Sequence, residues 1–293
     1  MDDVRFDRLA RTLDGRRSRR AATALLGGLL ASPLLASEES AAKKKKRKKK
    51  CKPGPAAQTC AGKCGSVRNR CKKMVDCGPC TPPCTGLQPT ADLQAAINAA
   101  APGSTLTLCA GTWTAPAGSL SISKSLTLIG AGIGQTILDG ANVRTVLAVS
   151  GGNDTTVTLE GLTITRGKST TAAGGISTSG NLTLRDVDIT ANHAERGGGI
   201  LQLGGTLTLA AGTRVTGNSA ILDVQSPAGI GGGICVFEGS VTLEAGTSVT
   251  QNTASDAGGG IWAFSQNAVT LEPGSTVSNN IQDNCEPNIG ACT

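Results

Sequence analysis

The densest group of chemically capable side chains lies between residues 185 and 196. Its members suited to acid–base chemistry are Asp186, Asp188, His193 and Glu195. Cleavage of an acidic polysaccharide needs paired carboxylates, or a calcium site with a basic proton acceptor. A catalytic site here would need acidic partners in the next repeat, but the equivalent residues 210–214 have none. We therefore interpret the cluster as a charged, solvated edge and identify no catalytic residue, cofactor site or metal site.

Cysteine is the second residue type whose spacing suggests chemistry. Seven of the 11 cysteines fall within residues 51–84, among Gly, Pro, Lys and Arg and few apolar residues. A segment this small cannot bury a core, so covalent links must hold it together. Disulfides are the favoured link, but two short spacings would also suit a four-thiolate zinc site. These spacings are Cys60 to Cys64 and Cys77 to Cys80.

The spacing does not fix how the cysteines pair. The disulfide candidates are Cys51, Cys60, Cys64, Cys71, Cys77, Cys80, Cys84, Cys109, Cys285 and Cys292. Cys84 could reach Cys109 and tie the cysteine-rich segment to the region that follows. Cys285 and Cys292 could close a terminal loop. Because 11 is odd, at least one thiol lacks a partner within the chain, and we expect it to be Cys235, which lies inside a repeat.

The N-terminus predicts export. Residues 16–20 (Arg-Arg-Ser-Arg-Arg) precede an apolar stretch, 21–36, which is the layout of a signal peptide. Residues 18–20 resemble a twin-arginine signal, so we assign residues 1–42 to the export signal and its cleavage region. The apolar stretch is short for a bilayer span, so membrane contact is expected only through an uncleaved signal segment. An uncleaved anchor and a helical N-terminus of a cytosolic protein are the alternatives.

Charge divides the chain into two parts. Residues 1–84 carry 21 Lys and Arg against 7 Asp and Glu, a net charge of +14, whereas residues 85–293 carry 7 against 14, a net charge of −7. The run Lys43–Lys50, eight consecutive basic residues, repels itself and is expected to be disordered. It is either a solvated spacer or an attachment to an acidic polysaccharide or another anionic cell-envelope polymer. Because basic residues concentrate in the N-terminal part, no nucleic-acid partner is expected.

From about residue 104 the chain repeats itself. Units of the form Leu/Val-Thr-Leu, which alternate as a half-buried strand does, begin at Leu106, Leu126, Val157, Leu182, Leu207, Val241 and Val269. An Ile/Val-Thr-x-Asn/Gly unit and a Gly-Gly-Ile unit follow in the later copies. From Leu159 to Leu271 the final leucines of successive units are 25, 25, 34 and 28 residues apart. One coil with three short strands and three corners needs about this many residues.

This order of units predicts an all-β fold. We expect a single-stranded right-handed parallel β-helix over residues 88–284, with a cysteine-rich disulfide module (51–87) before it and a C-terminal tail (285–293) after it. Residues 91–101 have apolar side chains at helical spacing and end at Pro-Gly, which predicts a helix that caps the first coil. A propeller or sandwich would need recurring hairpin turns, and the Asp-Gly pair at 139–140 does not recur with the period.

The repeats also resemble known families. Residues 91–140, with helix, Pro-Gly, strand and Ala-Gly-Thr-Trp, resemble the opening of pectate-lyase-like β-helix proteins. The Gly-Gly-Gly-Ile and Val-Thr-x-Asn units resemble the repeats of polymorphic outer-membrane proteins and of bacterial right-handed β-helix repeat proteins. The resemblance implies a fold more than an activity, because this superfamily holds lyases, hydrolases, epimerases and adhesins. The galacturonase motifs and the calcium-binding nonapeptide are absent, and residues 152–155 match the first motif only superficially.

A possible binding face follows from the Gly-Gly-Ile units. If each isoleucine points inward, the next residue points outward, and an exposed row would consist of Ser177, Leu201, Cys235 and Trp262. Such a row could stack on a sugar ring or a partner. Under the opposite phase these residues would fill the core instead. Residues 219–229 lie in the longest repeat and predict a projecting loop.

These patterns favour an exported protein, secreted or at the cell surface, whose scaffold serves binding or adhesion without a recognisable catalytic site. A polysaccharide lyase or glycoside hydrolase that acts on acidic polysaccharide is the alternative. Structural display without a specific ligand is the third possibility.

Overall fold

The computed structural model describes residues 66–69, 71–77, 84–170, 173–221, 229–286 and 292 of the 293-residue chain. The predicted export signal, the basic run and most of the cysteine-rich segment lie outside the described residues. So do most of the predicted loop 219–229 and four of the cysteines, Cys51, Cys60, Cys64 and Cys80.

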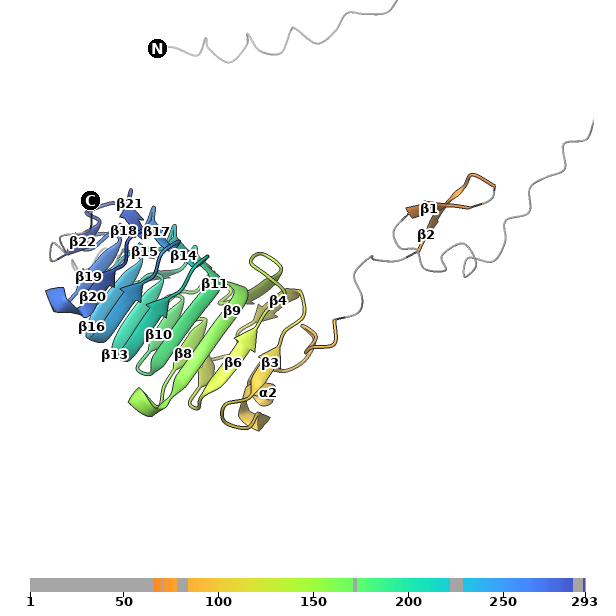
Figure 1. Ribbon diagram of the computed structural model, residues 1–293, viewed down its shortest axis with the longest axis horizontal. Helices are drawn as coiled ribbons and strands as arrows, with labels where there is room; N and C mark the ends of the chain where they lie inside the picture. Colours follow the sequence, from red (N-terminus) through yellow and green to blue (C-terminus); the bar gives the residue numbers. More distant parts are fainter. Residues whose placement is uncertain are drawn as a thin grey trace, which may run out of the picture.

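The predicted all-β architecture is confirmed, and its main sheet is parallel (Figure 1). Seventeen strands belong to this sheet, and each pairs in parallel with a segment one repeat away in the sequence. The described residues also include an antiparallel pair in the cysteine-rich segment, β1 (Ser66–Arg68) with β2 (Met74–Asp76). The repeats thus stack in one direction, as their sequence pattern predicts.

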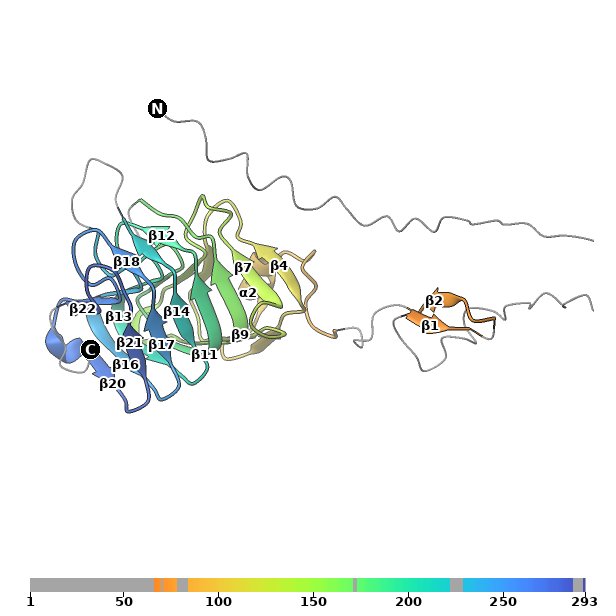
Figure 2. The same ribbon diagram turned by 90° about the horizontal axis from the view of Figure 1, so that it is seen from above.

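Three strand positions recur in each repeat, and we call them faces A, B and C. Face A comprises β3 (Thr105–Thr107), β6 (Leu126–Ile129), the first halves of β9 (Thr156–Thr165) and β11 (Asn181–Thr190), the second halves of β13 (Ile200–Leu209) and β16 (Ile234–Leu243), and β20 (Val269–Leu271). Face B comprises β4 (Gly111–Thr114), β7 (Thr136–Asp139), the second halves of β9 and β11, β14 (Arg214–Thr216), β17 (Ser248–Thr250) and β21 (Thr276–Ser278). Face C comprises β5 (Leu120–Ile122), β8 (Leu147–Val149), β10 (Ile176–Thr178), the first halves of β13 and β16, β19 (Ile261–Ala263) and β22 (Cys285–Glu286). A narrow additional row contains β12 (His193–Ala194), β15 (Ser219–Ala220) and β18 (Thr253–Ala254), and Figure 2 shows part of it together with face B.

Like residues stack over like residues on the inner side of each face. On face A, Leu126 pairs with Val157, Val157 with Leu182, and the column continues to Val269. The inner columns of faces B and C join the same buried cluster. Because burying one Leu or Ile side chain contributes about 1.5–3 kcal/mol, this shared core holds the three faces together.

The first Leu/Val-Thr-Leu unit is out of step with the others. Leu106 pairs with Leu128 rather than with Leu126, so this unit is offset by two residues from the column that the later units form. A shift of two keeps the same side chains on the inner side, whereas a shift of one would turn them outward. Leu108 is consequently fully buried.

A ladder of asparagines, buried except at its last member, runs along one corner. Asn192, Asn218, Asn252 and Asn280 each follow face B, and each side-chain Nδ2 donates to the Oδ1 of the next asparagine at 3.0 Å. The left-handed backbone of the corner falls on the residue before the asparagine, as at Ala191 (φ 54) and Gln251 (φ 58). The asparagines therefore bond between repeats, whereas the preceding residues adopt the left-handed geometry.

One α-helix forms among the described residues, α2 (Leu93–Ala99), inside the predicted segment 91–101. The Asp92 side chain accepts a hydrogen bond from the backbone N–H of Ala95 and so caps its first turn. Leu93 and Ile97 are buried in the main cluster. The Gln94 side chain exchanges two hydrogen bonds with the backbone of Ser121, which fixes the helix against β5.

Candidate binding groove

The connection from face C to face A changes length along the stack. β8 leads into the 3-10 turn η1 (Gly152–Asp154) before β9, and β19 leads into η2 (Gln266–Ala268) before β20. The three connections between them are short and contain Gly180, the pair Gly204–Gly205, and Gly239. The two longer turns therefore stand on either side of these three short, glycine-containing connections, which we call the floor (Figure 1).

This floor contains an open groove of about 500 Å³. Its lining residues are Asn153, Asn181, Gly204, Gly205, Thr206, Glu238 and Gly239. Gly205 and Gly239 have φ values of 69 and 87, and a Cβ at Gly239 would overlap the carbonyl oxygen of Gly205. Because glycine alone permits this close approach, backbone atoms form much of the floor.

The polar side chains of the groove are held in place by hydrogen bonds. Asn181 Nδ2 donates to the backbone oxygen of Asn153 at 2.7 Å. Asn181 Oδ1 accepts from the backbone N–H of Thr206 at 3.0 Å and from its hydroxyl at 2.9 Å. Asn181 and Thr206 therefore present a fixed amide and a fixed hydroxyl group at the groove.

Two buried polar side chains support the floor from inside. Thr178 and Gln202 occupy neighbouring positions of an inner column of face C that is otherwise apolar, and both are fully buried. The Thr178 hydroxyl lies 3.3 Å from both backbone polar atoms of Gly180, and Gln202 Nε2 donates to the carbonyl of Gly204. Each therefore fixes the glycine corner of its own repeat.

The groove is acidic. Glu238 is the only charged residue of its lining, and Asp154 adds a second exposed carboxylate beside Asn153. Within the part of the chain that the structure describes, neither carboxylate forms an ion pair. The groove therefore disfavours anionic ligands.

An aromatic patch borders the groove on face C. The chain has only 3 Phe, 2 Trp and no Tyr, and Phe237, Trp262 and Phe264 gather here. The rings of Phe237 and Trp262 lie 5.3 Å apart, and the Arg196 guanidinium lies 5.5 Å from the Phe237 ring centre. Phe264 is 76% exposed. Its backbone N–H donates to the carbonyl of Val236, so Phe264, directly after β19, lies beside Phe237, the residue that precedes Glu238.

The predicted exposed row forms a column, but it is not exposed. Ser177, Leu201, Cys235 and Trp262 are successive register partners on the outer side of face C. Leu201 and Cys235 are buried in a second, small cluster with Ala173, against which Ile230, Phe237 and Trp262 pack. The phase was therefore right and the exposure wrong.

Glycine turns explain why the column is covered. Each Gly-Gly-Gly-Ile unit begins with a left-handed glycine, such as Gly231 (φ 64) or Gly258 (φ 64). A Cβ on Gly231 would lie 2.6 Å from Cys235 Cβ, and one on Gly258 would lie 2.6 Å from Trp262 Cβ. The turns therefore fold back over the residue that follows each isoleucine.

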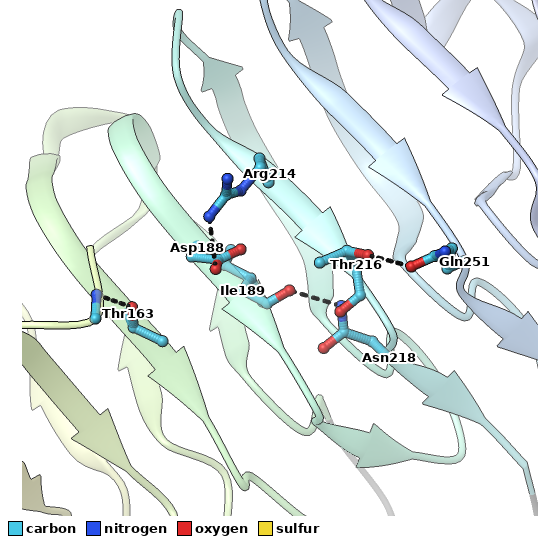
Figure 3. Close-up of polar contacts among 8 residues, drawn as sticks. Thr163, Asp188, Ile189, Arg214, Thr216, Asn218 and Gln251 are labelled. Carbon is cyan, nitrogen blue, oxygen red and sulfur yellow. Dashed lines mark hydrogen bonds and ion pairs between the residues drawn. The ribbon is translucent and has the colours of Figure 1, made fainter.

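The charged cluster is divided among separate partners. Asp188 pairs with Arg214 of the next repeat at 3.0 Å (Figure 3), and Glu195 lies 3.9 Å from Arg196. Asp186 is exposed at a left-handed corner. These contacts are compatible with a solvated edge, and they pair both Asp188 and Glu195 with arginine rather than with a second carboxylate.

His193 lies in the narrow additional row, apart from these ion pairs. Its Nδ1 lies 2.7 Å from Ser219 Oγ. Partial burial, and then the charge of Lys168, lower the pKa of His193 below its usual value of 6.5. Among the described residues no group of three or more His, Cys, Asp or Glu could hold a metal ion.

The cysteines that the structure describes are mostly oxidised. Disulfides join Cys84 to Cys109 and Cys285 to Cys292, with Cα atoms 5.7 and 5.9 Å apart. Cys71 and Cys77 are also disulfide-bonded, so Cys77 does not serve as a zinc ligand. Cys235 is a buried free thiol, as the sequence suggested, and burial raises its pKa to about 12. These bonds indicate an oxidising environment.

Comparison of the chain with protein-family models, curated proteins and solved structures finds no match. The pectate-lyase-like resemblance of the repeats therefore gains no support from known proteins. No helix of the described residues is long and apolar enough to cross a membrane.

The groove itself was not predicted. Two signals were present in the sequence: the unequal lengths of the connections from face C to face A, and the polar Thr178 and Gln202 in an apolar column. Both signals can be interpreted only when the register of the face C strands is known.

Proposed function

We propose that the repeat domain is a right-handed parallel β-helix, with α2 covering its first turn, and that the chain is an exported binding or adhesion protein rather than an enzyme. Parallel pairing of like residues around one core supports the fold. The resemblance to pectate-lyase-like and polymorphic outer-membrane proteins belongs to this proposal.

The groove is the observation that carries a binding function. It offers amide and hydroxyl groups fixed by hydrogen bonds, a backbone floor and an adjoining exposed aromatic ring. A volume of about 500 Å³ suits a small ligand or part of a larger one. Its lining has one carboxylate, whereas glycoside cleavage generally requires two facing each other across the bond.

The basic N-terminal part supplies an attachment in this proposal. The net charge of +14 over residues 1–84, against −7 for the rest, suits a stem that binds an anionic envelope polymer through Lys43–Lys50 while the domain faces outward. The disulfides agree with a secreted or cell-surface location. Nucleic acid is not a proposed partner, and a membrane is one only through an uncleaved signal segment.

A salt series tests the attachment. The full chain should be retained on immobilised polygalacturonate at low salt and released steeply as salt rises, because exposed charges are screened. A variant with serine at every position from 43 to 50 should not be retained. Equal retention of the two proteins would contradict the proposed role of the stem.

Product analysis tests the absence of catalysis. Incubation of the full chain with a panel of polyuronates and neutral polysaccharides should release neither unsaturated ends nor reducing ends above a heat-treated control. Steady release of either product would show an enzyme and would overturn this part of the proposal.

A further inference from the structure

The geometry of the groove points to its ligand: we infer that it binds an uncharged oligosaccharide. This inference rests on the proposed binding function and names the class of ligand.

The dimensions suit a short run of sugar rings. From Asn153 to Gly239 the groove crosses four successive repeats. Three inter-strand steps of ~4.8 Å separate these repeats, so the groove is roughly 14 Å long. The turn η1 closes one end, and η2 stands one repeat beyond the other. A polymer lying along the stack could therefore place a few of its units in the groove and leave the remainder outside.

The floor suits groups rich in hydroxyls. Glycines at 204, 205 and 239 let a ligand approach the backbone closely, because none of them carries a side chain. Asn181 and Thr206 are already held by one another, so a ligand would not have to immobilise them. Preorganised donors and acceptors of this kind lower the entropic cost of binding.

The exposed ring suits the apolar face of a sugar. Phe264 leaves 76% of its surface in water, and Leu203, the register partner of Glu238, leaves 44%. Leu203 directly precedes Gly204 of the groove lining. Phe264 lies one repeat away, beside the residue that precedes Glu238. Covering such a ring with the C–H face of a pyranose removes apolar surface from water and adds stacking.

Charge decides between sugar classes. Glu238 belongs to the lining and Asp154 follows Asn153 at the other end of the groove, and both carboxylates are exposed. The lining contains no Lys or Arg. A uronate would bring like charges together, which costs free energy even in the solvated groove. The groove therefore excludes the acidic polysaccharides to which the basic stem would bind, and the two parts recognise different polymers.

The test uses the full chain with serine at positions 43–50, which lowers the net charge of residues 1–84 from +14 to +6 and so weakens attraction of anions by the stem. Titration calorimetry would compare uncharged oligomers of glucose, xylose, mannose and N-acetylglucosamine with oligogalacturonate of matched length. At least one uncharged oligomer should bind, and oligogalacturonate should bind at least tenfold more weakly. The inference is overturned when no uncharged oligomer binds, or when oligogalacturonate binds as tightly as the best of them.

Two variants locate the site. Phe264→Ala should weaken binding of the uncharged oligomer about tenfold, the scale of one lost stacking contact. Ile281→Ala, at a side chain 64% exposed beside Thr253 of the narrow additional row, is the matched control and should leave the affinity unchanged. Equal affinity of both variants and the parent would place the ligand elsewhere.

A third variant, Glu238→Gln, isolates the effect of the carboxylate charge. Oligogalacturonate should gain affinity several-fold, whereas the uncharged oligomer should change less than twofold. Glu272→Gln, also exposed, serves as the control. No gain for oligogalacturonate would refute the charge argument. A negative result in all of these titrations would overturn the oligosaccharide inference and leave only attachment through the stem, whereas product release in the incubation assay would overturn the non-enzymatic function even if the oligomers bind.

Discussion

Two corners of the same stack use polar groups in opposite ways. At the corner after face B, four asparagines, three of them buried, bind one another and the backbone, so their side-chain amides are paired within the protein. At the corner between faces C and A, glycines expose the backbone, and Asn181 and Thr206 face an open groove. Full pairing of repeated side chains thus produces buried structure, whereas interruption of the repeats by longer turns leaves an open groove.

Removing one member of the ladder should give the largest effect. Asn218 is 1% exposed, and its Nδ2 donates to the carbonyl of Ile189 at 2.8 Å (Figure 3) and to Asn252 at 3.0 Å. Asn218→Ala should lower the free energy of unfolding by about 2–4 kcal/mol, because it leaves buried partners unsatisfied. Urea denaturation followed by circular dichroism measures this.

Asn267→Ala, at an exposed position of η2, is the control for that loss and should change stability by less than about 0.5 kcal/mol. Similar losses in the two variants would mean that the ladder contributes nothing specific.

A methyl group at the glycine corner should give the next effect. Gly239→Ala adds both left-handed strain and overlap with the Gly205 carbonyl, and we expect a loss of about 2–4 kcal/mol. Gly246→Ala adds the same strain at φ 81, but its Cβ would meet nothing closer than 3.8 Å, so about 1 kcal/mol is expected. Thermal unfolding of both variants would show the difference, and equal losses would argue against close backbone approach at Gly239.

The support beneath the groove should affect local opening more than global stability. Gln202→Leu removes the hydrogen bond to Gly204 and replaces the amide with an apolar side chain of similar size in the column. We expect global stability to change by less than about 1 kcal/mol, while amide hydrogen exchange at residues 203–206 becomes faster. Unchanged exchange there would show that Gln202 does not hold the floor.

The smallest effect concerns pH. Burial lowers the pKa of His193 in the folded protein below the 6.5 of the unfolded chain. The unfolded state therefore binds the proton first, so stability is complete above pH 6.5 and falls as the pH drops through that value. His193→Gln should flatten this dependence in denaturation midpoints measured from pH 8 to pH 5, and an unchanged slope would exclude His193 as its source.

The sequence predicts the columns of the stack better than its surfaces. The alternation in Leu182-Thr183-Leu184 and its copies specifies which side chains are inside, because a register error of one residue would reverse every one of them. A shift of two residues leaves the alternation unchanged, so the alternation alone does not reveal the offset of the strand at Leu106.

The exposure of an outward side chain depends on the backbone that lies over its strand. The alternation of apolar and polar residues along a strand does not indicate this cover. Leu201 and Cys235 point outward as predicted, yet glycine turns cover them. The groove depends on connection length, which is ten residues from Leu147 to Val157 and six from Ile176 to Leu182. Such differences gain meaning only when the strands on both sides have been aligned.

A crystal structure of the full chain grown with the tightest uncharged oligosaccharide tests the central claim most directly. We predict parallel repeats throughout, sugar rings between Asn153 and Gly239, and the Phe264 side chain against one ring. An oligosaccharide bound at another surface, with the glycine corner in contact only with solvent, would contradict the account.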